Sequence, residues 1–288
     1  MSHERKFSRR DFAKLFGVGG LLFLASCAPK IPLKETASPT LKNTETPTLL
    51  PSKSPTLTKT STLTVTRTEA VPTKEDERKI PPPKMMVLGD SITKFGFADY
   101  LSEALNEEGY QVEFVGSNIS NKNVKNEGHG GFSTIEIERD LEDGFWSWGG
   151  TETPTHLDEN IPNILVLELG TNDAASGLNP EKITIPNFRK IVTIFRSKKP
   201  EVKIIIFPVI PSALEWDRMV KKINKLFLDL TRELYTEKSP VFLAPDVRSD
   251  NFDTDKDLVD GVHPSASGYQ KMVKSCMVVL EKMISRKN

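Results

Sequence analysis

Short apolar runs alternate with segments of helical periodicity after residue 84 of this chain. The run NILVLELG at 163–170 constrains the fold most, because it is apolar at nearly every position rather than at every second one. Such a strand is covered on both faces, as strands inside a parallel sheet are. The alternation therefore predicts an α/β fold of three layers, α/β/α, with a mostly parallel sheet of about five strands.

The expected elements are placed by their patterns. Strands are expected where apolar runs are bounded by turn residues, at 84–90, 111–117, 163–170, 203–209 and 241–244. Amphipathic helices are expected at 98–109, 133–144, 186–200, 214–235 and from about residue 265. Ser133 or Thr134 is expected to cap the second helix. Functional side chains of such sheets gather where the carboxyl ends of strands meet loops, so motifs that follow strands matter most.

The first 83 residues have a different character. SRRDFAK at 8–14 resembles a twin-arginine export signal, and LASC at 24–27 resembles the site at which bacterial lipoproteins are cleaved and lipidated. We expect a signal peptide over 1–27 with lipid on Cys27; an uncleaved signal anchor is the alternative. Residues 28–83 are rich in Thr, Pro and Ser and hold no aromatic residue, so we expect a disordered tether. The folded domain is then 84–288.

Charge and cysteine content narrow the function classes. The chain has 39 basic and 39 acidic residues, so its zero net charge gives no indication of a nucleic-acid partner. If Cys27 carries lipid, Cys276 has no partner for a disulfide. We expect a monomer that is extracytoplasmic and lipid-anchored to a bacterial membrane.

Four motifs fall near the expected strand ends. GDSIT at 89–93 follows the first strand, and NEGHGGFST at 126–134 offers three glycines that let the backbone approach a ligand. LGTND at 169–173 follows the most apolar strand, and DGVHP at 260–264 precedes the last helix. Taken singly, each has an ordinary interpretation as a helix cap, a loop tip or a turn.

Together the motifs contain the groups for nucleophilic catalysis. A serine hydroxyl such as that of Ser91 needs a neighbouring base to take its proton. A neutral imidazole is such a base when a carboxylate fixes its tautomer, and Asp260 lies three residues before His263. The amide of Asn172 can donate a hydrogen bond to developing negative charge. Their order along the chain indicates Ser–His–Asp chemistry.

These four blocks resemble the SGNH hydrolases, also called the GDSL family, over about 84–285. The resemblance implies a flavodoxin-like fold with Ser91 as nucleophile, His263 as base and Asp260 as the orienting acid. It also implies an oxyanion hole formed by the backbone N–H of Ser91, the backbone N–H of Gly131 and the side chain of Asn172. Gly130 is the adjacent alternative to Gly131.

VEFVGS, NEGHGGFST and PNILVLELGTND are similar to carbohydrate esterase family three, whose members remove acetyl groups from xylan. Gly130 and Phe132 depart from that family's Ser or Pro and Trp. The likeness implies an acetylesterase that acts on acetylated polysaccharide or another small ester, without metal or organic cofactor. Candidate substrate contacts are Asp90, His129, Phe132, Trp146 and Trp148. For His129 we favour a role in loop packing, and the two tryptophans suit either sugar stacking or core packing.

Several alternatives remain open at this point. A lipid-directed esterase, a lysophospholipase or a thioesterase would use the same triad, and a peptidoglycan or surface-polymer deacetylase is a close variant. A non-catalytic carbohydrate-binding module of the cell surface would have the same fold but no esterase activity. SITK at 91–94 also matches the Ser-x-x-Lys of penicillin-binding proteins, but the Lys-Thr-Gly element is missing.

Overall fold

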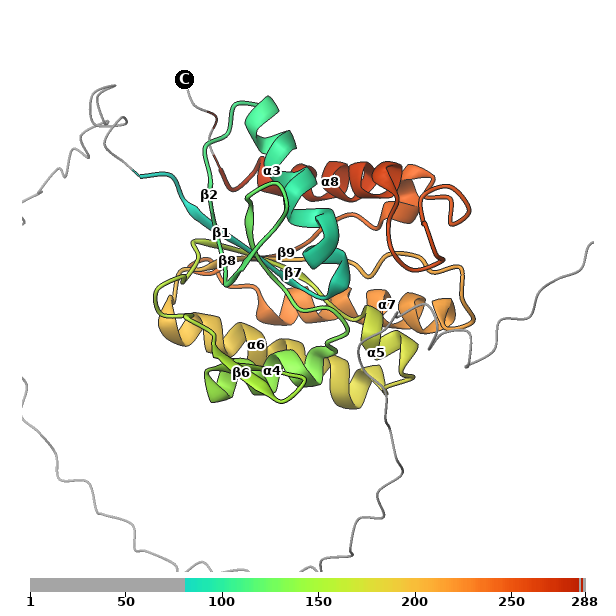
Figure 1. Cartoon of the computed structure of the whole chain (residues 1–288), viewed down its shortest axis with the longest axis horizontal. Coiled ribbons are helices and arrows are strands. Elements are labelled where there is room, and N and C mark those ends of the chain that lie inside the picture. Colours follow the sequence, from blue (N-terminus) through green and yellow to red (C-terminus); the bar gives the residue numbers. More distant parts are fainter. Residues whose placement is uncertain (1–80, 285, 287–288) are drawn as a thin grey trace, which may run out of the picture. The chain divides into compact units, whose positions relative to one another are not determined.

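The computed structural model describes residues 81–284 and 286 (Figure 1). The expected signal peptide, almost all of the expected tether and Cys27 lie outside these residues. Within them, every helix is too short or too polar to cross a bilayer.

A mostly parallel sheet forms the centre of the domain (Figure 1). Four parallel strands lie side by side in the order β1 (Lys84–Gly89), β7 (Ile164–Glu168), β8 (Lys203–Ile206) and β9 (Val241–Leu243). The other edge of β1 is shared by two short parallel strands, β2 (Glu113–Val115) and β4 (Lys125–Gly128). Antiparallel β3 (Asn118–Ile119) pairs with β4. The predicted α/β fold class is confirmed.

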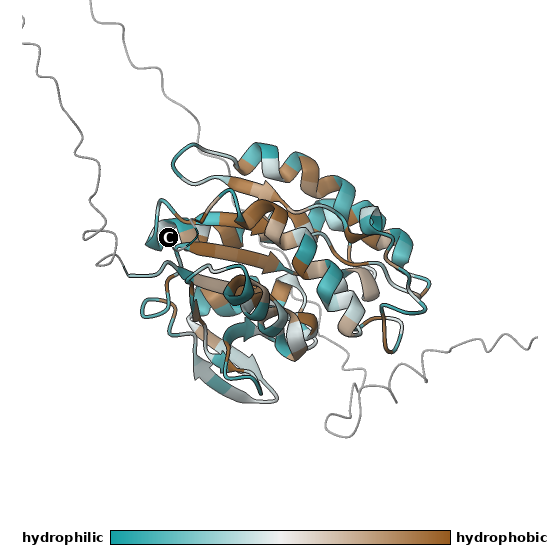
Figure 2. Cartoon of the chain, turned by 90° about the horizontal axis from the view of Figure 1, so that it is seen from above, coloured by the Kyte–Doolittle hydropathy of each residue, from teal (hydrophilic) through white to brown (hydrophobic). Residues whose placement is uncertain are grey.

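Helices cover both faces of the sheet. One face is covered by α3 (Ala98–Glu107) and α8 (Ala266–Leu280), and the other by α4 (Thr134–Asp143), α6 (Ile185–Lys198) and α7 (Asp217–Leu234). Met85 and Val87 of β1 pack into the first layer, whereas Met86 and Leu88 pack into the second. Successive side chains of a strand point to opposite faces, so a continuous apolar run is what a sheet between two helical layers requires. Figure 2 shows these hydrophobic strands between helices that carry hydrophilic residues.

Polar side chains set the start of two helices. The Oγ of Ser133 accepts a hydrogen bond from the N–H of Ile135, and the Glu136 carboxylate accepts one from the N–H of Ser133. This reciprocal cap confirms Ser133 as the start of α4, which ends at Gly144 in the left-handed conformation (φ 80°). Ser265 caps α8 in the expected place. The caps fix the second and fourth motifs at helix N-termini.

Several elements were not predicted. Besides β3 and β4 they are the hairpin of β5 (Phe145–Trp148) and β6 (Thr151–Pro154), the short helix α5 (Thr171–Ala175), the π-helical turns η1 (Thr93–Phe97) and η2 (Pro180–Thr184), and the 3₁₀ turn η3 (Val247–Asp250). The hairpin is largely exposed and β4 is polar, so neither shows the apolar pattern by which strands are recognised.

Candidate active site

The ends of three adjacent strands bring the first three motifs together. Gly89, the last residue of β1, pairs in register with Gly128 of β4 and with Glu168 of β7. The residues that follow these strand ends belong to GDSIT, NEGHGGFST and LGTND. The fourth motif reaches the same edge from the loop before α8. The helix itself is tied to the first motif, because the hydroxyl of Tyr269 in α8 donates to the carbonyl of Ile92 at 3.2 Å.

A chain of hydrogen bonds links Ser91, His263 and Asp260. The Oγ of Ser91 lies 2.8 Å from Nε2 of His263, although 172 positions separate them. The other ring nitrogen, Nδ1, lies 2.7 Å from Oδ2 of Asp260. The imidazole is therefore oriented from both sides, with the carboxylate favouring the tautomer that leaves Nε2 free to accept a proton. This arrangement can carry a proton from the serine hydroxyl to the imidazole.

The surroundings of the Asp260 carboxylate favour its ionised form. Partial burial opposes its ionisation, but hydrogen bonds from the backbone N–H of His263, from its ring and from the N–H of Val262 outweigh burial and hold the pKa of Asp260 below its usual value. An ionised carboxylate in this place stabilises an imidazolium on His263. Ser91 itself is only 7% exposed.

Asp90 and Asn172 link the motifs around Ser91. Ser91 stands at the start of a helical turn, where backbone N–H groups have no partner within the helix; Asp90 caps this turn by accepting from the N–H of Ile92 at 2.9 Å. The side-chain amide of Asn172 donates to the carbonyl of Phe132 at 2.8 Å and makes a longer contact of 3.4 Å with Asp90. Asn172 thus ties the third motif to the first two.

The two glycines of the second motif lie differently. A Cβ built on Gly130 would be 3.8 Å from the Cβ of Ser91, so this residue lies directly against the serine. Gly131 has a φ of +84°, in the left-handed region that favours glycine, and a Cβ there would be 3.6 Å from the Trp148 ring. Both glycines therefore belong to the loop beside Ser91.

Three of the candidate substrate contacts are in the interior. Asp90, Phe132 and Trp146 are 0%, 3% and 4% exposed, and their role as substrate contacts stays a prediction. Packing explains each case, since Asp90 caps the turn and both rings belong to the core layer of α4 and α6. Trp148 is different: it is 64% exposed and lies against Phe132 with ring centroids 5.5 Å apart.

His129 has a carboxylate partner that the sequence analysis missed. Its Nε2 lies 2.8 Å from Oε1 of Glu127, and its ring lies against Trp146 with centroids 3.8 Å apart. Glu127 also accepts from the N–H of Ser117 at 2.8 Å. The signal was present, because residues two apart in a strand share a face. These contacts agree with a role of His129 in packing the loop.

Two buried carboxyl groups lie under Ser91. Burial raises the pKa of Asp90 to about 6. Glu168 accepts a hydrogen bond from Oγ1 of Thr93 at 3.0 Å. Burial, and then the charge of Asp90, raise the pKa of Glu168 well above its ordinary range. Sequence reasoning passed over Glu168 because it ends an apolar strand; a charged residue in such a run was the available signal.

The turn after Ser91 exposes two side chains. Phe95 is 65% exposed, and its ring meets that of His263 edge-on with centroids 5.8 Å apart. Lys94 is exposed, and its Cδ lies 3.8 Å from the position of a Cβ on Gly130. Because the Ser91 hydroxyl is bonded to His263, the Ser-x-x-Lys interpretation, in which Lys94 is the base, lacks structural support.

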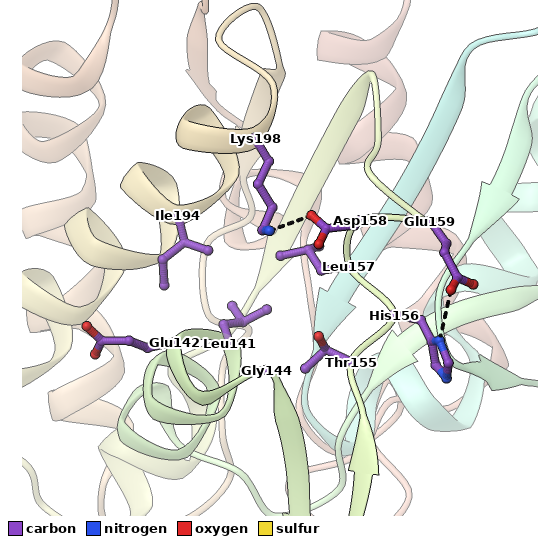
Figure 3. Close-up of a pocket in the computed structure, with 10 residues that line it drawn as sticks. All are labelled: Leu141, Glu142, Gly144, Thr155, His156, Leu157, Asp158, Glu159, Ile194 and Lys198. Carbon is purple, nitrogen blue, oxygen red and sulfur yellow. Dashed lines mark hydrogen bonds and ion pairs between the residues drawn. The ribbon is translucent and has the colours of Figure 1, made fainter.

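A cavity of about 430 Å³ lies away from Ser91 and His263 (Figure 3). Leu141, Leu157 and Ile194 face it, and Lys198 points across it to Asp158. Its lining includes residues just before β7 and the end of the helix before β8, which places it at the amino ends of the strands. Ser91 follows the carboxyl end of β1, so the cavity is not part of the candidate site.

The chain is similar in sequence to known esterases. The chain is 31% identical over 226 residues to a multidomain esterase of Ruminococcus flavefaciens. The aligned part covers 69% of this chain but only 28% of that esterase. It is 24% identical over 192 residues to an arylesterase of Vibrio mimicus, covering 63% of this chain and 80% of that protein.

Among solved structures, an acetyl esterase mutant with an acetate ion shares 26% identity at a TM-score of 0.60, covering 70% of this chain and 97% of that one. A carbohydrate esterase family 3 protein of Talaromyces cellulolyticus shares 27% identity, also at 0.60, covering 70% and 100%. The model of the GDSL-like Lipase/Acylhydrolase family matches residues 87–271. The chain belongs to this family.

Proposed function

We propose that this protein is a serine esterase that removes acetyl groups from carbohydrate. The observation that carries the proposal is the hydrogen-bonded chain of Ser91, His263 and Asp260 at the carboxyl end of β1. Similarity to an acetyl esterase and to a family 3 carbohydrate esterase supports the acyl group and the substrate class. The exposed ring of Trp148 beside the site supports a sugar ligand, since flat aromatic faces stack on sugar rings.

The first half of the reaction forms an acetyl-enzyme. Oγ of Ser91 attacks the acetyl carbonyl carbon while Nε2 of His263 takes the hydroxyl proton, and Asp260 stabilises the resulting imidazolium. The carbonyl oxygen becomes an oxyanion that accepts hydrogen bonds from the N–H of Ser91, the N–H of a loop glycine and the amide of Asn172. The bond to the sugar oxygen then breaks, and His263 gives its proton to that oxygen.

The second half regenerates the enzyme. Water attacks the acetyl carbon of the acetyl-enzyme and gives its proton to His263. A second oxyanion forms and collapses, the bond to Oγ of Ser91 breaks, and the serine recovers its proton from the imidazolium. Acetic acid leaves and loses its remaining proton to solvent as acetate.

Acetate release from a substrate panel tests this function. The wild type should hydrolyse acetylated xylan and p-nitrophenyl acetate, and prefer acetate over octanoate in the p-nitrophenyl series. Ser91→Ala should lose about 10³-fold or more in turnover, whereas Ser197→Ala, at an exposed serine of α6, should not. Preference for octanoate or lysophospholipid would indicate a lipid-directed esterase. A folded protein inactive on the whole panel would indicate a non-catalytic module.

We also propose that the enzyme is exported and held at a bacterial membrane by lipid on Cys27, with residues 28–83 as the tether. The motifs SRRDFAK and LASC support this. Fatty-acid labelling in a bacterial host should mark the wild type and Cys276→Ala, but not Cys27→Ala. Equal labelling of Cys27→Ala would exclude the anchor.

A further inference from the structure

Lys94 is a cation placed at the rim of the candidate site. It lies in η1, three residues after Ser91, and its backbone packs closely on β4, because a Cβ on Gly128 would be only 2.4 Å from the Lys94 nitrogen. Its side chain runs along Gly130, the residue that lies against Ser91. The backbone position of the lysine is therefore fixed, while its ammonium group reaches solvent beside the serine.

The carboxylates around the site are already engaged or buried. Asp260 is bonded to His263, Glu127 to His129, and Asp90 and Glu168 are in the interior. Among the described residues, Lys94 forms no ion pair. An exposed lysine that has no ion-pair partner in residues 81–284, and whose side chain passes the glycine next to the serine, is available to an anionic group of the substrate.

Aromatic rings flank this cation. Phe95, its neighbour in the chain, lies edge-on to His263, and the Trp148 ring lies over Gly131. Both are about two-thirds exposed, at 65% and 64%. Large exposed rings on two different elements, η1 and β5, give sugar units open stacking faces next to residues that adjoin the serine.

We propose that Lys94 binds a carboxylate of the glycan, so that the preferred substrate is an acetylated acidic glycan. The carboxylate belongs to a sugar unit beside the acetylated one, either as a uronic acid or as a lactyl ether. This inference rests on the proposed esterase function and specifies its substrate class. The ammonium contributes a point charge close to the reacting ester, and the aromatic rings hold the neighbouring sugars.

The test compares acidic and neutral substrates of the same length. We would measure kcat/KM for uronate-bearing acetylated xylo-oligosaccharides, for acetylated cell-wall glycan fragments with lactyl carboxylates, and for neutral acetylated xylo-oligosaccharides. The wild type should prefer one of the two acidic substrates over the neutral one by about 2- to 5-fold, the range expected for an exposed charge contact. Which acidic substrate reacts faster identifies the source of the carboxylate.

Substitutions of Lys94 test whether this lysine causes the preference for acidic substrates. Lys94→Met should bring the acidic-to-neutral ratio close to one, and Lys94→Glu should bring it below one. The ratio cancels any general change in catalysis. Lys225→Met, which removes an exposed lysine of α7, is the matched control and should keep the wild-type ratio. Added salt of about 0.5 M should lower the wild-type ratio, because it screens exposed charges.

The results distinguish a wrong role for Lys94 from a wrong esterase function. Equal wild-type rates on acidic and neutral glycans, or a preference that survives in Lys94→Met, would overturn the role of Lys94 while leaving the esterase intact. Faster, Lys94-dependent hydrolysis of lysophospholipid would overturn the assignment to glycans. A wild type without activity on any of these esters or on p-nitrophenyl acetate would contradict the proposed function itself.

Discussion

The carboxamide of Asn172 connects three motifs with one side chain. It donates to the carbonyl of Phe132 and lies 3.4 Å from Asp90. Asn172→Ala removes one proposed oxyanion donor, and loss of one such donor costs about 10²–10³ in kcat. We expect that fall on p-nitrophenyl acetate with little change in KM. Asn160→Ala, which loses an amide before the start of β7 rather than after its end, should behave as the wild type. A kcat within about twofold of normal for Asn172→Ala would contradict the proposed role.

The buried carboxyl of Asp90 makes stability depend on pH. Its pKa is about 6 in the folded protein and 3.8 ordinarily, so the folded state binds the proton more tightly between these values. The free energy of unfolding therefore falls as pH rises from about 4 to about 6, and this loss is complete above pH 6. The falling stability is the direction expected for a carboxyl whose pKa is raised by burial.

Asp90→Asn tests that dependence. The asparagine oxygen can still cap the N–H of Ile92, but the residue carries no charge. From pH 4.5 to pH 7.5, urea denaturation should show the variant gaining stability relative to the wild type by on the order of 2 kcal/mol. Parallel pH dependences of the two proteins would mean that Asp90 does not titrate in this range.

At the scale of elements, β4 determines where the glycine loop lies. Its last residue, Gly128, pairs with Gly89, and Glu127 fixes the ring of His129 beyond the strand end. His129→Ala leaves the buried carboxylate of Glu127 without that partner, at about 1–3 kcal/mol. We expect lower thermal stability and a kcat lowered by about tenfold on p-nitrophenyl acetate, with KM nearly unchanged, because the loop beside Ser91 loses its support.

His129→Gln provides the matched comparison. Glutamine keeps an N–H donor that can reach Glu127, so it should recover more of both stability and kcat than alanine. If the two variants lose stability and kcat to the same extent, the hydrogen bond to Glu127 does not position the loop.

The sequence was sufficient for the main elements of the fold. The strands β1, β7, β8 and β9 and the helices on both faces follow from apolar runs and helical periodicity, since these elements bury side chains in regular patterns. The residues Ser91, His263, Asp260 and Asn172 were also named from motifs, and the structure places them at one edge of the sheet. Short motifs at strand ends are informative because parallel strands end at the same edge.

Elements that bury polar side chains, and ring contacts between distant residues, were not predicted. The strand β4 has the sequence KNEG, and its charged Glu127 is buried only because Ser117 and His129 supply hydrogen bonds. Phe95 gives no sign in the sequence that its ring meets His263, which lies far along the chain. Polar burial and contacts of this kind are tertiary properties without a local pattern.

At the scale of the whole molecule, the site joins both ends of the described domain. Ser91 follows the first strand, whereas His263 precedes the last helix, and Tyr269 of α8 donates to the carbonyl of Ile92. The Tyr269 ring also packs on Gly96, where a Cβ would be 2.9 Å from it. The site can therefore exist only when the first and last elements are docked on the same core.

This dependence predicts that activity and fold are lost together. In a urea titration, hydrolysis of p-nitrophenyl acetate and the far-ultraviolet circular dichroism should decline with coincident midpoints, as for a single cooperative unit. Activity that is lost at clearly lower urea would show that α8 or its preceding loop detaches before the core unfolds.

Covalent labelling of the nucleophile tests the central claim most directly. A fluorophosphonate reacts with a serine whose proton is taken by a neighbouring base. Intact-mass and peptide analysis should find one adduct, on Ser91, with no adduct in Ser91→Ala and labelling slowed by about 10³-fold or more in His263→Ala. An adduct on another residue, or equal labelling of His263→Ala and wild type, would contradict activation of Ser91 by His263.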